Sequence, residues 1–93
     1  MIPAARIQAA IELLAEIIAT PRPADGTVSA YFRDRRFIGS HDRAAINTRI
    51  YRIMRAYHRL GWWIRRCGCE VDARALVIAA LMFGREHSMA SIE

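Results

Sequence analysis

Apolar residues recur at helical spacing along one long segment of the chain, residues 39–60. At about 100° per residue, six of them share one face of a helix. They are Ile46, Ile50, Ile53, Met54, Tyr57 and Leu60. The opposite face of the same helix carries Arg49, Arg52, Arg55 and Arg59. The pattern predicts one amphipathic helix with an apolar side toward a core and an arginine-rich side toward the outside.

The predicted start of this helix lies at residues 39–42. Gly39 permits an unusual backbone turn, Ser40 is a favourable N-cap, and Asp42 lies in the first turn, where the helix dipole favours an anion. Arg43 is near the apolar side and next to Asp42, so we expect it to form an ion pair or a helix-start hydrogen bond. Ser40, Asp42 and Arg43 are therefore predicted to be structural. Truncating Arg43 is expected to cost roughly 1–3 kcal/mol if its partner is left buried and unpaired.

A second amphipathic pattern covers residues 3–19, where Pro3 suits the first helical turn. Its apolar stripe consists of Ile7, Ile11, Leu14 and Ile18, with Ala10 and Ile17 beside it. Pro21 and Pro23 follow the helix and end it, because a proline disfavours the helical conformation in the residue before it. The first predicted helix is therefore separated from the next by a short proline-containing turn.

Residues 27–36 are predicted to form a short second helix, capped by Asp25 or Thr27. Its apolar edge is formed by Val28, Tyr31 and Phe32. Phe37 and Ile38 precede the long helix, and an apolar residue before an N-cap often packs back onto the first turns. We therefore expect both side chains to be packed.

Beyond Leu60, Trp62 and Trp63 are expected to wedge between the longer helices, and Gly68 allows a further break in the chain. A final helix, residues 73–86, is apolar on nearly all sides and is predicted to be central, with Asp72 as its cap. No period-two alternation indicates a strand. The sequence predicts an all-α domain of about five helices spanning residues 1–93.

The charge of the chain indicates an anionic partner. All fourteen basic residues are arginine, and the formal net charge is +5. Arginine-biased codon usage accounts for the missing lysine but not for the excess of base over acid. That excess favours nucleic acid ahead of a membrane surface. No secretory signal or membrane-spanning run is visible, and Cys67 and Cys69 are too close for an ordinary disulfide, so we expect a cytoplasmic protein without membrane partners.

Several motifs follow one another in a characteristic order. Asp42-Arg43 opens the long helix, Ile50-Tyr51 and Arg55 follow, and then Leu60-Gly61-Trp62. In this order the segment RFIGSHDRAAINTRIYRIMRAYHRLGWWI resembles the NusB-like helical domain. It is most similar to the version at the N-terminus of bacterial RNA cytosine-5 methyltransferases of the Sun/Nop (RsmB-type) family. The opening ARIQAAIELLAEI and the stretch RALVIAALMFGRE are similar to the first and fifth helices of that domain.

The resemblance implies a non-catalytic domain that binds RNA, expected to be ribosomal, and positions it for methylation. The chain departs from the family by ending before the further helices, so we expect an incomplete domain that a methyltransferase domain follows. That domain would use S-adenosylmethionine, and no cofactor is expected in these residues, which contain no Gly-rich loop or Pro-Cys motif. Alternatives are an antitermination factor, or a protein–protein interaction module that packs on its own catalytic domain or on a second copy.

The candidate RNA contacts are mainly arginines, whose guanidinium groups suit phosphates and stack on unpaired bases. They are Arg49, Arg52, Arg55 and Arg59, with Arg65 and Arg66 extending the patch and Arg33, Arg35 and Arg36 on a nearby corner. The alternative is a solvated helix face. Tyr51 lies off the apolar ridge and is the candidate for base stacking. Tyr57, Phe32 and at least one tryptophan are expected in the core.

Other chemistry is poorly supported by the sequence. One Cys-x-Cys pair with scattered histidines, His41, His58 and His87, does not provide the two spaced pairs that structural zinc usually requires. No cysteine–histidine partnership or acid–base pair can be recognised from the spacing. We therefore predict neither a metal site nor catalytic residues.

Overall fold

The computed structural model describes residues 1–92, and the side chains of residues 1–83. It contains five helices: α1 (Pro3–Ala19), α2 (Ala24–Arg33), α3 (Ser40–Arg55), α4 (Tyr57–Arg66) and α5 (Ala73–Ile92). No strand occurs within residues 1–92, and none of their helices is long and apolar enough to cross a membrane. The predicted all-α fold of about five helices is confirmed.

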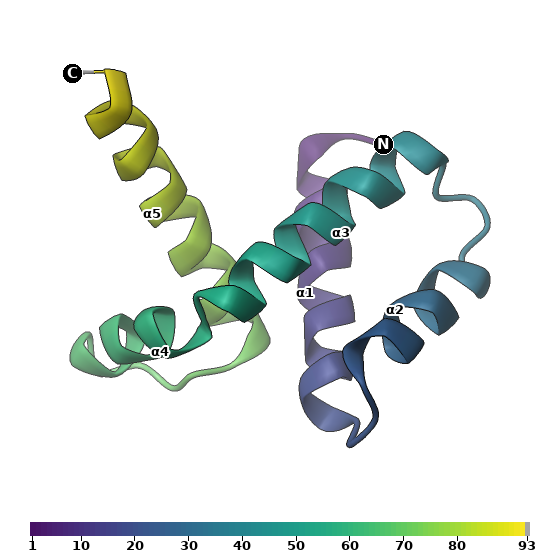
Figure 1. The fold of residues 1–93 in the computed structure, drawn as a ribbon, viewed down its shortest axis with the longest axis horizontal. Helices are drawn as coiled ribbons and strands as arrows, with labels where there is room; N and C mark the ends of the chain where they lie inside the picture. The colour runs from purple at the N-terminus through teal and green to yellow at the C-terminus, as the bar shows by residue number, and fades with distance from the viewer. Residues whose placement is uncertain (93) are drawn as a thin grey trace.

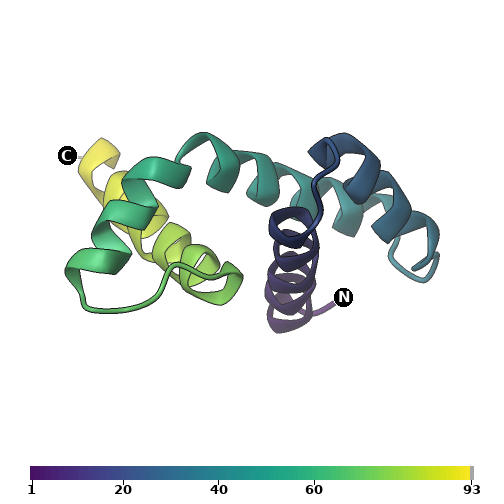
Figure 2. The same cartoon turned by 90° about the horizontal axis from the view of Figure 1, so that it is seen from below.

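Helices α1 and α3 cross at the middle of the molecule (Figure 1). Figure 2 shows α1 nearly end-on beneath the middle of α3, with α2 on one side and α4 on the other. The core at this crossing includes Ala10, Leu13 and Leu14 of α1 with Ile46 and Ile50 of α3. Helix α1 also contacts α2 and α5, so it is as central to the packing as α3.

The buried face of α1 differs from the predicted stripe. Leu13 and Ala10 are fully buried, whereas Ile18 is 51% exposed and Ile7 and Ile11 are only partly buried. The prediction placed Ile18 on the core side because it follows the period of the other three stripe residues. The actual face is set by three neighbouring helices, α2, α3 and α5, which contact α1 from different directions.

The long helix predicted over residues 39–60 is interrupted at Ala56, which has φ −99° and ψ 10°. Its amide N–H is shared between the carbonyls of Arg52 and Ile53, and a new helix, α4, begins at Tyr57. The prediction of one continuous helix is therefore wrong. The apolar positions remain in the core on both sides of the break: Ile46, Ile50, Ile53 and Leu60 are buried. Tyr57 is exposed at the start of α4, which corrects its expected place in the core.

The start of α3 is stabilised differently from the prediction. Gly39 occupies the N-cap position with ordinary extended backbone, φ −69° and ψ 165°, and no side chain caps the helix, so Ser40 is not the N-cap. Asp42 accepts a hydrogen bond of 2.7 Å from Arg6 Nε and lies 3.5 Å from the Met1 amino group. Asp42 therefore anchors α1 to the first turn of α3 through Arg6, a partner that the sequence analysis did not predict.

Arg43 is not the partner of Asp42. Its side chain is exposed and forms no ion pair with any side chain described in residues 1–83. The expected structural role of Arg43 is therefore wrong, and its truncation should not leave a buried group unpaired. The reason is positional: Arg6 approaches Asp42 from α1, and the sequence around residue 42 contains no sign of that contact.

The remaining helix ends agree with the predictions in part. Helix α2 begins at Ala24, three residues before the predicted start, and neither Asp25 nor Thr27 caps it. Asp72 does cap α5, because its Oδ1 accepts a 2.8 Å hydrogen bond from the Ala75 amide. Gly68 has φ 80°, a conformation that favours glycine, where the chain turns between α4 and α5.

The predictions for the loop before α3 and for the last helix, α5, are each confirmed only in part. Ile38 is buried at 1% exposure, but Phe37 is 80% exposed, so only one of these neighbours packs as predicted. Helix α5 buries Leu76 and Val77 completely, yet exposes Ile78 and Met82. It is therefore part of the core on one side only, and it continues past the predicted end at residue 86.

The ion pair at Asp42 predicts a pH dependence of stability. The hydrogen bond from Arg6 is the main cause that holds the pKa of Asp42 below its ordinary value of 3.8. Its contribution to folding is complete above that ordinary value and is lost as pH falls through the folded-state pKa. We expect Asp42→Asn to lower Tm at pH 6, and the difference from wild type to shrink in more acidic buffer. Thermal unfolding followed by circular dichroism from about pH 2.5 to pH 6 measures this.

The matched control is Asp34→Asn, which removes an exposed carboxylate that forms no ion pair in the described part of the chain. This variant should follow the wild-type curve throughout. A constant gap between wild type and Asp42→Asn at every pH would contradict the assigned role of the Arg6–Asp42 pair.

Candidate nucleic-acid interface

Residues 43–66, which include most of α3 and all of α4, contain seven arginines and no aspartate or glutamate. Six of them we call the α3–α4 arginines: Arg49, Arg52, Arg55, Arg59, Arg65 and Arg66. Arg49 is half-buried and the other five are exposed. None forms an ion pair with the side chains described in residues 1–83. Half of the fourteen arginines of the chain are thus concentrated in residues 43–66, a segment without aspartate or glutamate.

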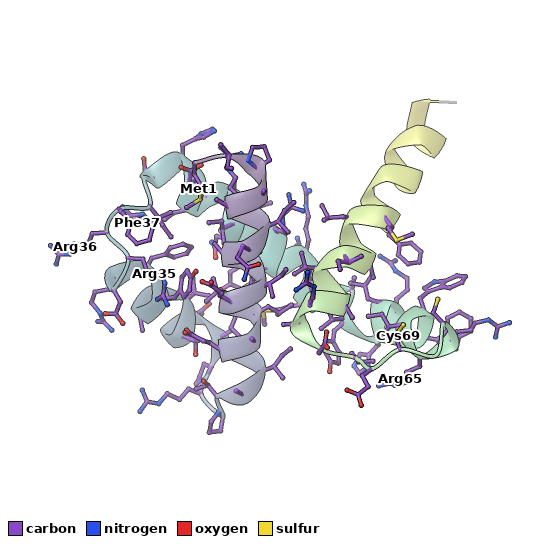
Figure 3. All side chains as sticks on the ribbon, turned by 180° about the vertical axis from the view of Figure 1, so that it is seen from behind. Met1, Arg35, Arg36, Phe37, Arg65 and Cys69 are labelled. Atoms are coloured by element: carbon purple, nitrogen blue, oxygen red, sulfur yellow. The ribbon has the colours of Figure 1, made fainter. Side chains whose placement is uncertain are left out.

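The basic residues at the end of α2 do not join this set as one patch. Arg35 lies 3.8 Å from the centre of the Tyr31 ring, donates to the Tyr31 carbonyl oxygen and approaches Glu16 at 4.0 Å. The contacts with Tyr31 are local, and the approach to Glu16 is the one that reaches α1, so the Arg35 guanidinium already has partners within the protein. Arg36 and Arg65 lie toward opposite ends of the molecule (Figure 3). Arg36 is therefore far from Arg65, whereas Arg33 lines the same hollow as Arg43 of α3, and a common corner for the three residues stays a prediction.

Both tryptophans of α4 are exposed, Trp62 by 52% and Trp63 by 42%. Their rings meet edge to face at 5.0 Å, and the Arg66 guanidinium lies 5.1 Å from the centre of the Trp62 ring. Trp63 also packs on Phe83 of α5 at 5.5 Å. Trp63 therefore lies against α5 in part, as predicted, but neither tryptophan is buried in the core, because Leu60, Gly61 and Ile64 supply the buried face of α4.

This exposure has a signal in the sequence. Leu60 and Ile64 are four residues apart and define one buried face, so Trp62 and Trp63 between them point to other sides of the helix. The position on the helix therefore decides which side chains of α4 are buried, even though the tryptophan rings have a larger apolar area than Leu60 or Ile64. An exposed indole with a guanidinium over it is a platform on which an unpaired base can stack.

Tyr51, the residue predicted to stack on a base, forms a hydrogen bond within the protein. Its hydroxyl donates a hydrogen bond to the Asp25 carboxylate, and this bond is the main cause that raises the pKa of Tyr51. The ring is half-buried and joins α3 to α2. Trp62, rather than Tyr51, is therefore the aromatic side chain best placed to meet a base.

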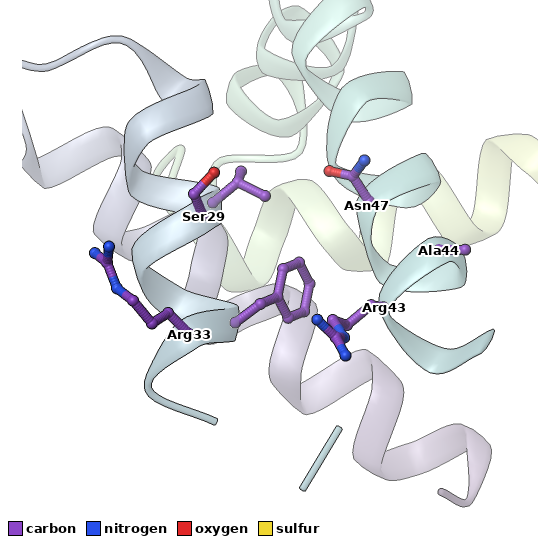
Figure 4. A pocket seen from close by; sticks show the side chains of 7 residues that line it. Ser29, Arg33, Arg43, Ala44 and Asn47 are labelled. Carbon is purple, nitrogen blue, oxygen red and sulfur yellow. The ribbon is translucent and has the colours of Figure 1, made fainter. Parts of the chain in front are cut away.

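An open hollow of about 410 Å³ lies between α2 and α3 (Figure 4). It is lined by Val28, Ser29, Phe32, Arg33, Arg43, Ala44 and Asn47. The Asn47 Oδ1 atom is buried and has no hydrogen-bond donor among the described residues. Leaving such an acceptor without a partner costs about 1–3 kcal/mol. Sequence reasoning missed Asn47, although a polar residue directly after Ile46 on the core side of a helix was a usable signal.

The cysteines and histidines do not gather into a ligand set in the part of the chain that the structure describes, where no group of three or more potential metal ligands occurs. Cys67 and Cys69 are exposed and free, and the Cys69 thiol points to the Cys67 carbonyl oxygen at 3.9 Å. His41 and His58 are exposed on α3 and α4. The side chain of His87 lies outside the described residues.

Comparisons with protein-family models, with curated proteins and with solved structures found no match to this chain. The resemblance of residues 36–64 to the NusB-like domain therefore remains a prediction from sequence motifs. Within residues 1–92 the structure defines five helices, with two exposed tryptophans on α4 and, on α3 and α4, six arginines that form no ion pair with the described side chains.

Proposed function

We propose that this protein is a non-catalytic RNA-binding module that uses the α3–α4 arginines and Trp62. The main support for RNA binding is the segment of residues 43–66, which contains seven arginines and no acidic residue. Unpaired guanidinium groups at a surface are free to form bidentate contacts with phosphates. Contacts of this kind orient a nucleic acid without reading its sequence.

The exposed aromatic rings favour single-stranded over double-stranded RNA. A base in a duplex is stacked on its neighbours, whereas an unpaired base can stack on an aromatic side chain or a guanidinium plane. Trp62 provides an exposed aromatic ring, and Arg66 provides a guanidinium plane that lies over one face of that ring. We infer that loops and other unpaired segments of a structured RNA are the substrates.

The sequence resemblance supplies the wider context of the proposal. In that context the module is the N-terminal domain of a cytoplasmic RNA cytosine-5 methyltransferase, and its RNA is ribosomal. A following domain would bind S-adenosylmethionine and perform the methylation. The five helices would position the RNA strand for that domain.

A second candidate function is protein docking, which the exposed apolar residues of α5 favour. Ile78 is 45% exposed and Met82 is 63% exposed. Apolar side chains exposed together mark a surface for another protein domain. The partner would be the catalytic domain of the same chain or a second copy.

Salt dependence tests the proposed RNA binding. We expect the affinity for a labelled single-stranded RNA to fall steeply with salt, with a slope of about −0.7 in log K against log salt for each arginine–phosphate contact. Six such contacts would give a slope near −4, by the same rule of about 0.7 each. Fluorescence anisotropy over a series of salt concentrations measures both the affinity and the slope.

Trp62→Ala separates stacking from charge within the same experiment. Losing one base–aromatic stack, worth about 1–3 kcal/mol, should weaken binding roughly 5- to 150-fold without changing the salt slope. Phe37→Ala is the matched control, because Phe37 is exposed but lies on the loop before α3. Undetectable binding, or a slope near zero, would overturn the RNA proposal and favour docking through apolar surface.

A further inference from the structure

The turn after α4 contains the two cysteines of the chain, Cys67 and Cys69, separated by Gly68. Cys67 is the C-cap residue of α4, and both thiols are exposed and free. Gly68 has φ 80°, so the chain changes direction between the two cysteines. The Cys69 sulfur lies 3.9 Å from the Cys67 carbonyl oxygen, so its side chain is directed back toward the other cysteine. The two thiols therefore share one small region of the surface at the end of α4.

Backbone hydrogen bonds fix the conformation of this turn. The Gly68 amide donates to the Arg65 carbonyl oxygen at 2.9 Å, and the Cys69 amide donates to the Ile64 carbonyl oxygen at 3.1 Å. Together they form a Schellman motif, in which a residue in the left-handed conformation ends a helix. Ile64 is buried, so the turn is attached to the core. The backbone of both cysteines is therefore held in place, while their exposed side chains can rotate about the Cα–Cβ bond.

The spacing suits a bridging metal ion better than a disulfide bond. A disulfide requires the sulfur atoms to meet at about 2.05 Å, with the Cβ atoms about 3.5–4.5 Å apart. A metal ion in line between two thiolates leaves the sulfur atoms about 4.6 Å apart, with metal–sulfur bonds of about 2.3 Å as in zinc sites. The Cα atoms of residues two apart are separated by at most about 7 Å, a distance that two side chains and an ion can span. An ion can therefore join the two cysteines with the turn as it stands.

The number and kind of ligands decide which ion the pair can hold. Thiolates are soft ligands, which select Cu(I), zinc or iron–sulfur clusters. Structural zinc takes four ligands, and within residues 1–83 the two thiols are not grouped with any third histidine, cysteine, aspartate or glutamate. Cu(I) differs from zinc because two thiolates in line complete its coordination. The ligand set therefore fits Cu(I) and leaves zinc two ligands short.

We propose that Cys67 and Cys69 bind one Cu(I) ion at the end of α4. Each cysteine releases its thiol proton to solvent and forms one copper–sulfur bond, so two protons leave for each ion and no electron is transferred. The resulting group, a monovalent cation with two thiolates, carries one net negative charge. This inference goes beyond the proposed RNA binding and does not depend on it.

The charges beside the pair favour such an anionic group. Arg65 and Arg66 directly precede Cys67, and neither forms an ion pair with a described side chain. Figure 3 shows Arg65 and Cys69 at the same end of the molecule. Glu70 follows Cys69 and acts against the arginines, but it contributes one charge where they contribute two.

Anaerobic titration with Cu(I) tests the site. The reduced wild-type protein is titrated against the coloured Cu(I)–bicinchoninate complex, and the loss of colour measures the copper transferred to the protein. We expect one Cu(I) per chain, retained against a large excess of glutathione. Glutathione offers one thiol, whereas the chain holds its second thiol at a high effective concentration. Native mass spectrometry gives the stoichiometry, and copper that is shared between two chains or lost to glutathione would overturn the proposal.

Cys67→Ser and Cys69→Ser each remove one sulfur ligand from an exposed position. We expect either variant to bind Cu(I) more than about 100-fold more weakly, since loss of an outer-shell partner alone costs about 10- to 100-fold. Both variants should keep the wild-type Tm, because neither side chain is buried. The control is His58→Ala, which removes an exposed imidazole from α4 and should bind as wild type does. Unchanged affinity in either serine variant would place the ion elsewhere and contradict the assignment.

A parallel titration with Zn²⁺ tests the number of ligands. We expect no tight binding of zinc, because the pair supplies only two of the four ligands that a structural zinc site requires. Zinc retained at one ion per chain would mean that further ligands join the thiols, and the two-ligand site would be wrong. The copper and zinc titrations contain no RNA and the RNA titrations contain no metal, so either proposal can fail while the other stands.

Discussion

Replacing Ile50 with alanine is expected to destabilise the protein by about 2–5 kcal/mol. Ile50 is fully buried in the core where α3 crosses α1. Removing three side-chain carbons there loses the transfer free energy of those atoms and leaves a cavity between close-packed helices. A domain of this size is stable by only about 5–15 kcal/mol, so the variant should lose a large part of its folding free energy.

Ile18→Ala is the matched control, since it makes the same chemical change on a helix surface. Ile18 is 51% exposed, and surface substitutions usually change stability by no more than about 0.5 kcal/mol. Urea unfolding followed by circular dichroism gives both free energies. Similar losses for the two variants would contradict the assigned core, because the sequence pattern alone places both isoleucines on apolar stripes.

Removing Arg52 and Arg55 together is expected to weaken RNA binding about 20- to 100-fold at physiological salt. This figure follows from non-specific association constants of about 10⁴–10⁶ M⁻¹ divided over six arginines. The salt slope should fall by about 1.4, which corresponds to two phosphate contacts. Anisotropy titrations of the same labelled single-stranded RNA at several salt concentrations measure both changes.

The charge-matched control is Arg22→Ala with Arg36→Ala, which lowers the net charge equally but lies outside the α3–α4 arginines. If net charge alone attracted RNA, the two double variants would bind equally, and the surface assignment would be wrong. Arg52 and Arg55 also lie in the last turn of α3, where cations stabilise the helix dipole by about 0.3–1 kcal/mol each. Circular dichroism should therefore confirm that the variant is folded before its binding is interpreted.

Local features of the sequence anticipated the helices because those features act within a few residues. The apolar spacing of Ile46, Ile50 and Ile53 predicted the core side of α3, and the structure buries all three. The Asp72 cap was predictable because the carboxylate and the amide of Ala75 are three residues apart. The prolines before α2 likewise act on their immediate neighbours.

The candidate site was less predictable because its geometry depends on which helices meet. The break at Ala56 moves Arg59 onto a different helix from Arg52 and Arg55, although the apolar period continues across it. Trp62 and Trp63 were assigned to the core from their size, yet the buried face of α4 lies at Leu60 and Ile64. Exposure of the tryptophans is therefore a property of the packing rather than of the residue type.

The sequence by itself determined that this chain is helical, where most of its helices lie, and that residues 43–66 are rich in arginine without aspartate or glutamate. Only the tertiary structure decided that Asp42 binds Arg6, that Arg35 rests on Tyr31, and that Asn47 faces a hollow between α2 and α3. The physical reason is the separation along the chain between the residues that interact. Periodicity and capping act over three or four residues, whereas the Arg6–Asp42 contact joins side chains 36 residues apart in the chain.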